Sequence, residues 1–197
     1  MWIISKQFDF EYGHRVWTQT LNEEYSCDGA CTCRGLHGHS GRVIVSLYSD
    51  TLQNNMVTDF KHLNWFKKFL DDNLDHKFLI DEHDPALPLL LSWMQTDIKL
   101  SEPDPLSSIR TVVYTSPQLP SLFAAEVLNS FAVLPFCPTS ENLTKWFFEI
   151  VDSKMSKLGV MVQGVQLFET AKSQANYIAV PKVLRPFNYL TNEKEEK

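Results

Sequence analysis

The sequence lacks the features that mark membrane-spanning and secreted proteins. No stretch reaches the roughly 18 consecutive apolar residues that a membrane-spanning helix needs. The amino terminus, "MWIISKQFDFEYGH", has no basic region followed by an apolar core and a small-residue cleavage site. We therefore expect a cytoplasmic protein that has no membrane partner.

Positive charge is also in short supply. The chain has 18 Lys and Arg against 24 Asp and Glu, which gives a formal net charge of −6. Proteins that bind nucleic acids generally need a basic surface to neutralise phosphates. We therefore expect no nucleic-acid partner.

The chain has few cysteines, and three of them are clustered. Of the four cysteines, Cys27, Cys31 and Cys33 lie within seven residues of one another and just before His37 and His39. In a reducing compartment this clustering favours a metal site or catalysis over disulfides.

The apolar pattern predicts a small α+β protein in a single domain of residues 1–197. Period-two alternation predicts a strand over 2–12, whose parity His14 continues, a second strand over 41–50, and strand-like structure within 160–180. The first two strands are expected to be antiparallel and joined by a loop over 15–36. A period of three to four predicts amphipathic helices that begin after Thr58 or Asp59 and after Pro138 and Thr139. Gly159 is expected to end the second helix.

The segment of about residues 81–137 breaks this pattern. Seven of the ten prolines lie between His76 and Pro138, around apolar stretches such as "LPLLLSWM". We expect an insertion that folds onto the body or forms an interface. The charged end of the chain, about residues 191–197, is expected to be a disordered tail.

The stretch "CRGLHGHS" at 33–40 suggests a metal site. In an extended chain His37 and His39 project from one face, roughly 6–7 Å apart. His14 ends the neighbouring strand with the same parity and is the natural third ligand. Three neutral imidazoles with an open position favour Zn²⁺, although a single histidine is more often a surface or core residue.

Cys33 has two possible roles at such a site. It could join Cys31, His37 and His39 in a small structural zinc finger, although four ligands would then crowd into nine residues. Alternatively, its thiol could transfer protons beside the metal. Asp75 and His76 fit the second role as a carboxylate that orients an imidazole, but a salt bridge at the end of a helix also explains them.

Glu169 lies on the apolar side of its predicted strand, together with Val165 and Leu167. A carboxylate in that position is costly unless it is paired. It either has a basic partner elsewhere in the chain or binds a ligand with adjacent N–H donors, such as a guanidine-like edge.

Five short segments resemble one family when they are taken together and in this order. They are "FEYGH" at 10–14, "CRGLHGHS" at 33–40, "LDH" at 74–76, "PTSEN" at 138–142 and "FET" at 168–170. The chain resembles the 6-pyruvoyl tetrahydropterin synthase and 6-carboxy-tetrahydropterin synthase group over residues 1 to about 80 and about 136 to 180.

The resemblance implies a tunnelling fold (T-fold), which is a four-stranded antiparallel sheet with two helices packed on one face. In this chain the insertion of about 81–137 would lie between the two helices. The subunits would form an oligomeric barrel with active sites at subunit interfaces, so the expected partners are a pterin substrate and further copies of the chain.

The resemblance also implies roles for individual residues. Zinc would be held by His14, His37 and His39. The proton-transfer group would be Cys33, assisted by Asp75 and His76, although Cys27 or Cys31 could take its place. The pterin would be bound through its amino-pyrimidine edge by Glu169, in a pocket also lined by Thr139 and Glu141.

The implied reaction converts 7,8-dihydroneopterin triphosphate to 6-carboxy-5,6,7,8-tetrahydropterin, acetaldehyde and triphosphate, a step toward 7-deazaguanine compounds such as queuosine. We favour this product because "CRGLHGHS" looks closer to the bacterial carboxy-tetrahydropterin enzymes. The alternatives are 6-pyruvoyl-tetrahydropterin as the product, a lyase of the same fold acting on dihydroneopterin itself, and a non-catalytic zinc-binding module.

Overall fold

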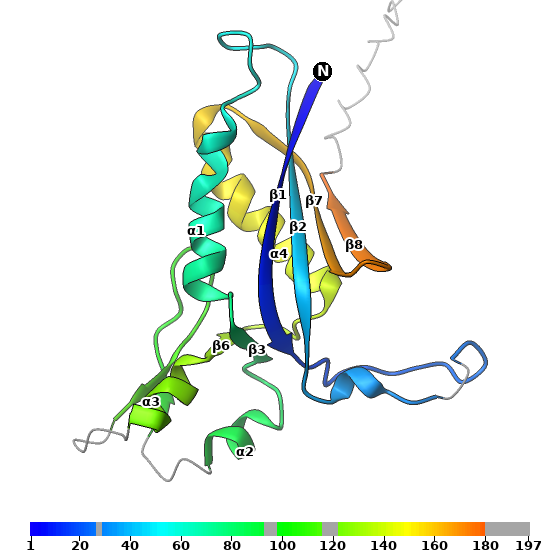
Figure 1. The fold of residues 1–197 in the computed structure, drawn as a ribbon, viewed down its shortest axis with the longest axis vertical. Coiled ribbons are helices and arrows are strands. Elements are labelled where there is room, and N and C mark those ends of the chain that lie inside the picture. The colour runs from blue at the N-terminus through cyan, green and yellow to red at the C-terminus, as the bar shows by residue number, and fades with distance from the viewer. Residues whose placement is uncertain (27–28, 93–97, 116–121, 180–197) are drawn as a thin grey trace, which may run out of the picture.

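A computed structural model describes residues 1–26, 29–92, 98–115 and 122–179 (Figure 1). Cys27 and the expected tail of about 191–197 lie outside these ranges. Within them, no helix combines the length and the apolar character needed to cross a membrane.

Four antiparallel strands form the larger part of the sheet. Strand β1 (Trp2–His14) pairs with β2 (His37–Ser49) along its whole length, so that His14 lies opposite His37. Strand β7 (Met161–Thr170) pairs with β2, and β8 (Ser173–Ile178) pairs with β7. The antiparallel pairing predicted for the first two strands is confirmed.

The expectation of a four-stranded sheet is wrong, because the described residues form a sheet of six strands in the order β6-β3-β1-β2-β7-β8. Strand β3 (Lys77–Asp81) pairs parallel to β1, and β6 (Phe131–Leu134) pairs parallel to β3. Both are short apolar strands, and β3 begins directly after the turn that follows the first helix. Periodicity does not distinguish such a run from the end of a buried helix.

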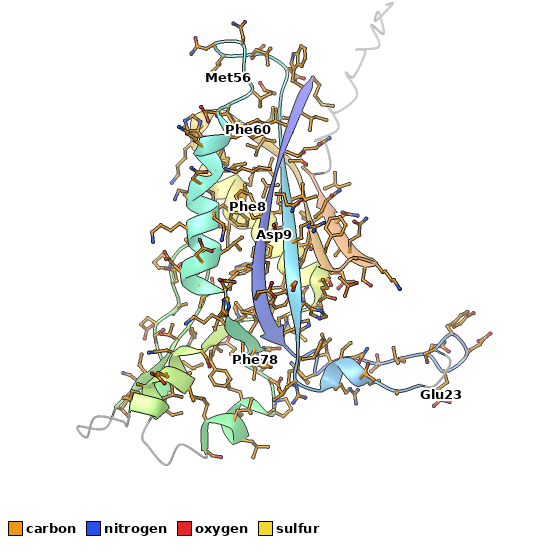
Figure 2. The ribbon with its side chains drawn as sticks, viewed as in Figure 1. Phe8, Asp9, Glu23, Met56, Phe60 and Phe78 are labelled. Atoms are coloured by element: carbon orange, nitrogen blue, oxygen red, sulfur yellow. The ribbon has the colours of Figure 1, made fainter. Side chains whose placement is uncertain are left out.

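Two helices pack on one face of the sheet. Helix α1 (Asn64–Asn73) follows the 3₁₀ turn η2 (Phe60–Leu63), and α4 (Ser140–Met155) continues into η3 (Ser156–Leu158). The ring of Phe8 lies 5.3 Å from that of Phe66 on α1, and Phe10 lies 6.1 Å from Phe147 on α4. Figure 2 shows Phe8 on the side of β1 that faces α1.

The three boundaries predicted from sequence are present, but two of them bound 3₁₀ turns, since η2 precedes α1 and η3 follows α4. Asp59 caps η2 by accepting a hydrogen bond from the Lys61 N–H, and Thr139 caps α4 by accepting one from the Asn142 N–H. Gly159 ends η3 with φ of +70°, in the left-handed region that glycine adopts without strain.

The expectation of two helices is incomplete, because the segment between β3 and β6 contains α2 (Leu87–Ser92) and α3 (Leu122–Asn129). It also contains a small hairpin of β4 (Ile98–Leu100) and β5 (Val112–Tyr114). A second apolar cluster joins these elements to the sheet, and its buried members are Ile80, Leu87, Val112, Leu128 and Val133. The segment thus packs around β3 and β6 (Figure 1).

An arm of residues 15–36 joins β1 to β2 and extends away from the body, with Glu23 near its far end (Figure 2). The arm returns through the 3₁₀ turn η1 (Thr32–Arg34). There the Val16 N–H donates a hydrogen bond to the Cys33 carbonyl at 2.7 Å, so Cys33 lies beside the start of the arm.

Candidate metal centre and the clefts beside it

Three histidines meet at one end of the sheet. The antiparallel register places His14 opposite His37, and His39 projects from the same face of β2 two residues later. The ring centroids are 4.4 to 5.0 Å apart, and one potential ligand atom from each ring lies within 4.8 Å of the others. The histidines singled out from sequence therefore form one cluster that could hold a metal ion.

Hydrogen bonds orient two of the three rings. The Nδ1 of His14 lies 2.7 Å from the Pro138 carbonyl oxygen, and the Nδ1 of His37 lies 3.0 Å from that of Gly35. Because a carbonyl only accepts, each Nδ1 carries the proton and each Nε2 keeps a lone pair. The Nε2 atoms of His14 and His39 are 3.1 Å apart. This donor set fits a divalent ion that prefers imidazole ligands.

The cluster favours neutral imidazoles. His14 is only 1% exposed, and burial lowers its pKa from 6.5 to about 4, with His37 and His39 acting in the same direction. The Pro138 hydrogen bond and Glu169 oppose that shift without cancelling it. Burial also lowers the pKa of His39. Neutral imidazole is the form that binds metals.

In the metal-free protein, we expect this burial to make stability depend on pH. The unfolded chain binds a proton at His14 below about pH 6.5, whereas the folded chain does so only near pH 4. The unfolded state therefore binds more protons in that window, and the free energy of unfolding falls as the pH drops from 6.5 to 4. We expect His14 to contribute a loss on the order of 3 kcal/mol.

Urea unfolding at several pH values, with a chelator present, measures this loss. The matched control is His14→Asn, whose side-chain amide can still donate to the Pro138 carbonyl but does not titrate. The variant should lose less stability than the parent between pH 6.5 and 4. Equal losses would show that His14 does not titrate as its burial implies.

Glu169 lies beside the cluster, on the face of β7 that sequence parity predicts. One of its carboxylate oxygens is 3.8 Å from the Nε2 of His14, and its side chain is 19% exposed. Among the described residues, no Lys or Arg forms an ion pair with it. The basic group that the structure places nearest to Glu169 is thus His14, and a role in ligand binding stays a prediction.

Tyr12 adds a buried hydroxyl to this region, which the sequence did not single out. The ring stacks on Phe10 at 4.9 Å, and a Cβ at Gly41 would come within 2.8 Å of it, so a glycine is needed there. Burial and the neighbouring Glu169 raise the pKa of the Tyr12 hydroxyl.

Two open clefts give access to the cluster. One, with a volume of about 710 Å³, is lined by His37, His39 and His76, among others. The other, of about 390 Å³, is lined by His39 and Glu169. His39 lines both clefts, and Glu169 lines the second.

Asp75 and His76 form a fixed pair at the first cleft. The Glu11 N–H donates to Asp75 at 2.8 Å and holds the pKa of that carboxyl below its usual range, with a further contribution from His76. The other Asp75 oxygen accepts from the His76 Nδ1 at 2.9 Å. His76 is exposed and has φ of +58°, which is unusual for a residue other than glycine. Its ring is therefore free to meet a ligand in the cleft.

Cys33 is close in sequence to the histidines, but its sulfur does not belong to the group of clustered ligand atoms. Cys31 and Cys33 are both free and partly exposed. The described residues therefore do not form the zinc finger of Cys31, Cys33, His37 and His39. The catalytic role of Cys33 stays a prediction.

Thr139 and Glu141 lie at the start of α4. The Thr139 hydroxyl accepts the capping hydrogen bond, and Glu141 is exposed in the first turn. Neither lines the two clefts described above. Their connection to the centre is the carbonyl of the preceding Pro138, which accepts from His14. A role in substrate binding stays a prediction for both.

Comparisons with known proteins point to one family. The family model for 6-pyruvoyl tetrahydropterin synthase matches residues 3–179. The 6-carboxy-5,6,7,8-tetrahydropterin synthase of Aquifex aeolicus is 34% identical over 190 residues, covering 89% of this chain and 97% of that protein. The protein of the same name from Synechocystis is 36% identical over 106 residues, covering 48% of this chain and 72% of that protein.

Solved structures show the same fold. An uncharacterized protein from Wolinella succinogenes has a TM-score of 0.82 at 44% identity, covering 90% of this chain and 97% of its own. The 6-pyruvoyl tetrahydropterin synthase of Plasmodium falciparum has a TM-score of 0.50 at 15% identity, covering 89% and 95% respectively. At that identity the second likeness shows the fold alone.

Proposed function

Because this chain belongs to the 6-pyruvoyl tetrahydropterin synthase family, we propose that it is a zinc-dependent 6-carboxy-5,6,7,8-tetrahydropterin synthase. The substrate is 7,8-dihydroneopterin triphosphate. One water is consumed, and the products are 6-carboxy-5,6,7,8-tetrahydropterin, acetaldehyde and triphosphate, a step toward 7-deazaguanine compounds. The Aquifex aeolicus relative, 97% of which is covered by the similarity, is a 6-carboxy-5,6,7,8-tetrahydropterin synthase by name, and this supports the carboxy product over the pyruvoyl compound.

The observation that carries the proposal is the histidine cluster with a carboxylate beside it. Two nitrogens bound to one zinc ion at the usual distance are ~3.3 Å apart. The Nε2 atoms of His14 and His39 are 3.1 Å apart, which fits such a pair. Zinc bound by His14, His37 and His39 would supply Lewis acidity toward the hydroxyls of the substrate side chain.

We assign Glu169 to binding of the pterin ring. Its carboxylate has no Lys or Arg ion-pair partner in the described part of the chain, and it opens onto the second cleft. A carboxylate can accept two parallel hydrogen bonds from adjacent N–H donors, as the amino-pyrimidine edge of a pterin provides. This contact would turn the substrate side chain toward the histidine cluster.

We assign proton transfer to Cys33 and to the Asp75–His76 pair. The thiolate of Cys33 would take a proton from the substrate side chain, and His76 would exchange protons with it from the first cleft. Asp75 holds the Nδ1 of His76 and stabilises the charged ring, which leaves the Nε2 facing the cleft.

We also propose that the chain forms a homo-oligomer with active sites at subunit boundaries. Both clefts are open in the single chain, and a neighbouring subunit would close them. Closing the site would exclude water from the charged intermediates.

Incubation of the zinc-loaded protein with 7,8-dihydroneopterin triphosphate tests the proposed reaction. Mass spectrometry should detect 6-carboxy-tetrahydropterin, together with acetaldehyde and triphosphate in equal amounts. A 6-pyruvoyl product without acetaldehyde would instead assign the alternative synthase activity. Product from dihydroneopterin, without released triphosphate, would assign a lyase, and no conversion of either substrate would leave a zinc-binding module.

A further inference from the structure

The short segment that follows His14 holds the backbone of Cys33. The Val16 N–H donates to the Cys33 carbonyl at 2.7 Å, and the Cys33 N–H donates to the side-chain oxygen of Gln19 at 3.0 Å. The next residue is held too, because the Arg34 Nε donates to the Gln19 carbonyl at 2.7 Å. Both main-chain polar groups of Cys33 are therefore bonded to this one segment, residues 15–19.

Two side chains of the segment reach across to the end of β3 and the loop after it. The indole N–H of Trp17 donates to the Asp81 carboxylate at 2.8 Å. The Arg15 Nε lies 3.1 Å from the Asp84 carboxylate, in an ion pair. Neither contact is local in sequence, so together they tie the arm to the beginning of the segment that we interpret as an insertion.

These two carboxylates are buried, so each of them needs hydrogen-bond or charge partners within the protein. The side chain of Asp84 is fully buried, with one oxygen accepting from the Ala86 N–H and the other facing Arg15. Asp81 is 5% exposed, and its second oxygen accepts from the His83 N–H at 2.9 Å. The Arg15 Nε and the Asp84 oxygen facing it make no hydrogen bond, so charge alone holds this pair. A buried carboxylate that loses its cation is strongly unfavourable, which favours keeping Arg15 beside Asp84.

The carboxylates are fixed relative to the metal centre. Asp81 is the last residue of β3, and two residues earlier Leu79 pairs with His14 on β1. The sheet therefore sets the distance from Asp81 to the histidine cluster. The same sheet carries His37 four residues after Cys33.

We propose that Asp81 and Asp84 are positioning residues for Cys33. Through Trp17 and Arg15 they hold residues 15–19 against the sheet, and residues 15–19 hold the backbone of Cys33 next to the metal centre. This inference rests on the proposed function, in which the Cys33 thiol transfers a proton. It means that the first residues of the inserted segment support proton transfer by positioning Cys33.

The variant Asp84→Asn tests the inference, because it removes the charge that fixes Arg15 while keeping an oxygen for the Ala86 N–H. The matched control is Glu82→Gln, since Glu82 lies nearby but pairs with Arg110, which does not belong to the arm. Zinc content and thermal unfolding are measured for both. The alkylation rate of Cys33 by iodoacetamide is followed by peptide mass spectrometry in the zinc-loaded protein.

We expect Asp84→Asn to keep zinc and its folded state while Cys33 is alkylated about fivefold faster, because the arm opens locally more often. We also expect kcat to fall about tenfold with KM nearly unchanged, since the thiol is misplaced but the pterin site is intact. The Glu82→Gln variant should match the parent in all these measurements. An alkylation rate and a kcat in Asp84→Asn equal to those of the control would overturn the inference.

A second variant covers the case in which Asp84→Asn does not fold. Trp17→Phe keeps an aromatic ring at this position but removes the hydrogen bond to Asp81, and it should speed alkylation of Cys33 in the same direction. An unchanged rate in Trp17→Phe would then overturn the inference. The alkylation measurement needs no substrate, so it decides the positioning role even if the parent converts no pterin, in which case the proposed function alone fails.

Discussion

Replacement of Cys33 by alanine is expected to reduce turnover about 1,000-fold while the protein keeps one zinc ion per chain. General acid–base groups typically contribute between 10² and 10⁴ to rate, and Cys33 is the thiol assigned to that step. The structural cost should be small, because the side chain is partly exposed and the hydrogen bonds of Cys33 involve only its backbone. Steady-state kinetics, metal analysis and thermal unfolding of the same preparation check the three parts of this expectation.

Cys31→Ala is the matched control for this experiment. Cys31 is also a partly exposed free thiol, two residues away on the same arm. It should retain nearly full turnover. Collapse of turnover in Cys31→Ala instead of Cys33→Ala would move the thiol role to Cys31. Loss of zinc together with unfolding in Cys33→Ala would contradict catalysis and support a structural metal site.

The parity of the strands was enough to predict the histidine cluster. Phe8, Phe10 and Tyr12 are buried on one face of β1, and His14 continues that face. On β2, the buried Val43 and Val45 have the same parity as His37 and His39. Because side chains alternate along a strand, the faces follow from sequence once the two strands pair antiparallel. Their register then brings the three rings together.

The two parallel strands at one edge of the sheet, β3 and β6, could not be predicted in the same way. In β3, Leu79, Ile80 and Asp81 are all buried, so there is no alternation to reveal a strand. Strands covered on both faces have continuous apolar runs of this kind. Strand β6 pairs with β3 across a separation of about fifty residues, and no local pattern specifies such a parallel pairing. The alternation did not reveal these two strands, and the family resemblance implied only four, whereas the described residues place six in this sheet.

The groups that orient the side chains of the site also could not be predicted from the sequence. The His14 and His37 rings are oriented by main-chain carbonyls. Every residue has a main-chain carbonyl, so the sequence does not indicate which ones accept these hydrogen bonds. Asp81 and Asp84 were not singled out either, because acidic residues in a proline-containing stretch usually indicate an exposed loop. Only the fold shows that both are buried and face the arm. Residue identity thus predicts candidate ligands better than it predicts what holds them.

Replacement of His37 by alanine is expected to weaken zinc binding by more than about 100-fold, because loss of a partner that only orients a ligand already costs 10–100-fold. His37 is the best of the three ligands for this test, since it is partly exposed and donates only to the nearby Gly35 carbonyl. Without metal, the variant should unfold within about 0.5 kcal/mol of the parent. Competition with a chromophoric chelator measures the zinc affinity.

The control is His62→Ala, an exposed histidine on η2 whose Nδ1 contacts only the Thr58 hydroxyl. It should bind zinc as the parent does. A 100-fold weaker affinity lowers the stability gained from a fixed excess of zinc by about 2.7 kcal/mol, so thermal unfolding with and without zinc gives an independent measurement. If His37→Ala kept both the zinc affinity and the stability gain, the ion would have to bind elsewhere. The catalytic and substrate-binding roles proposed around this histidine cluster would then be wrong.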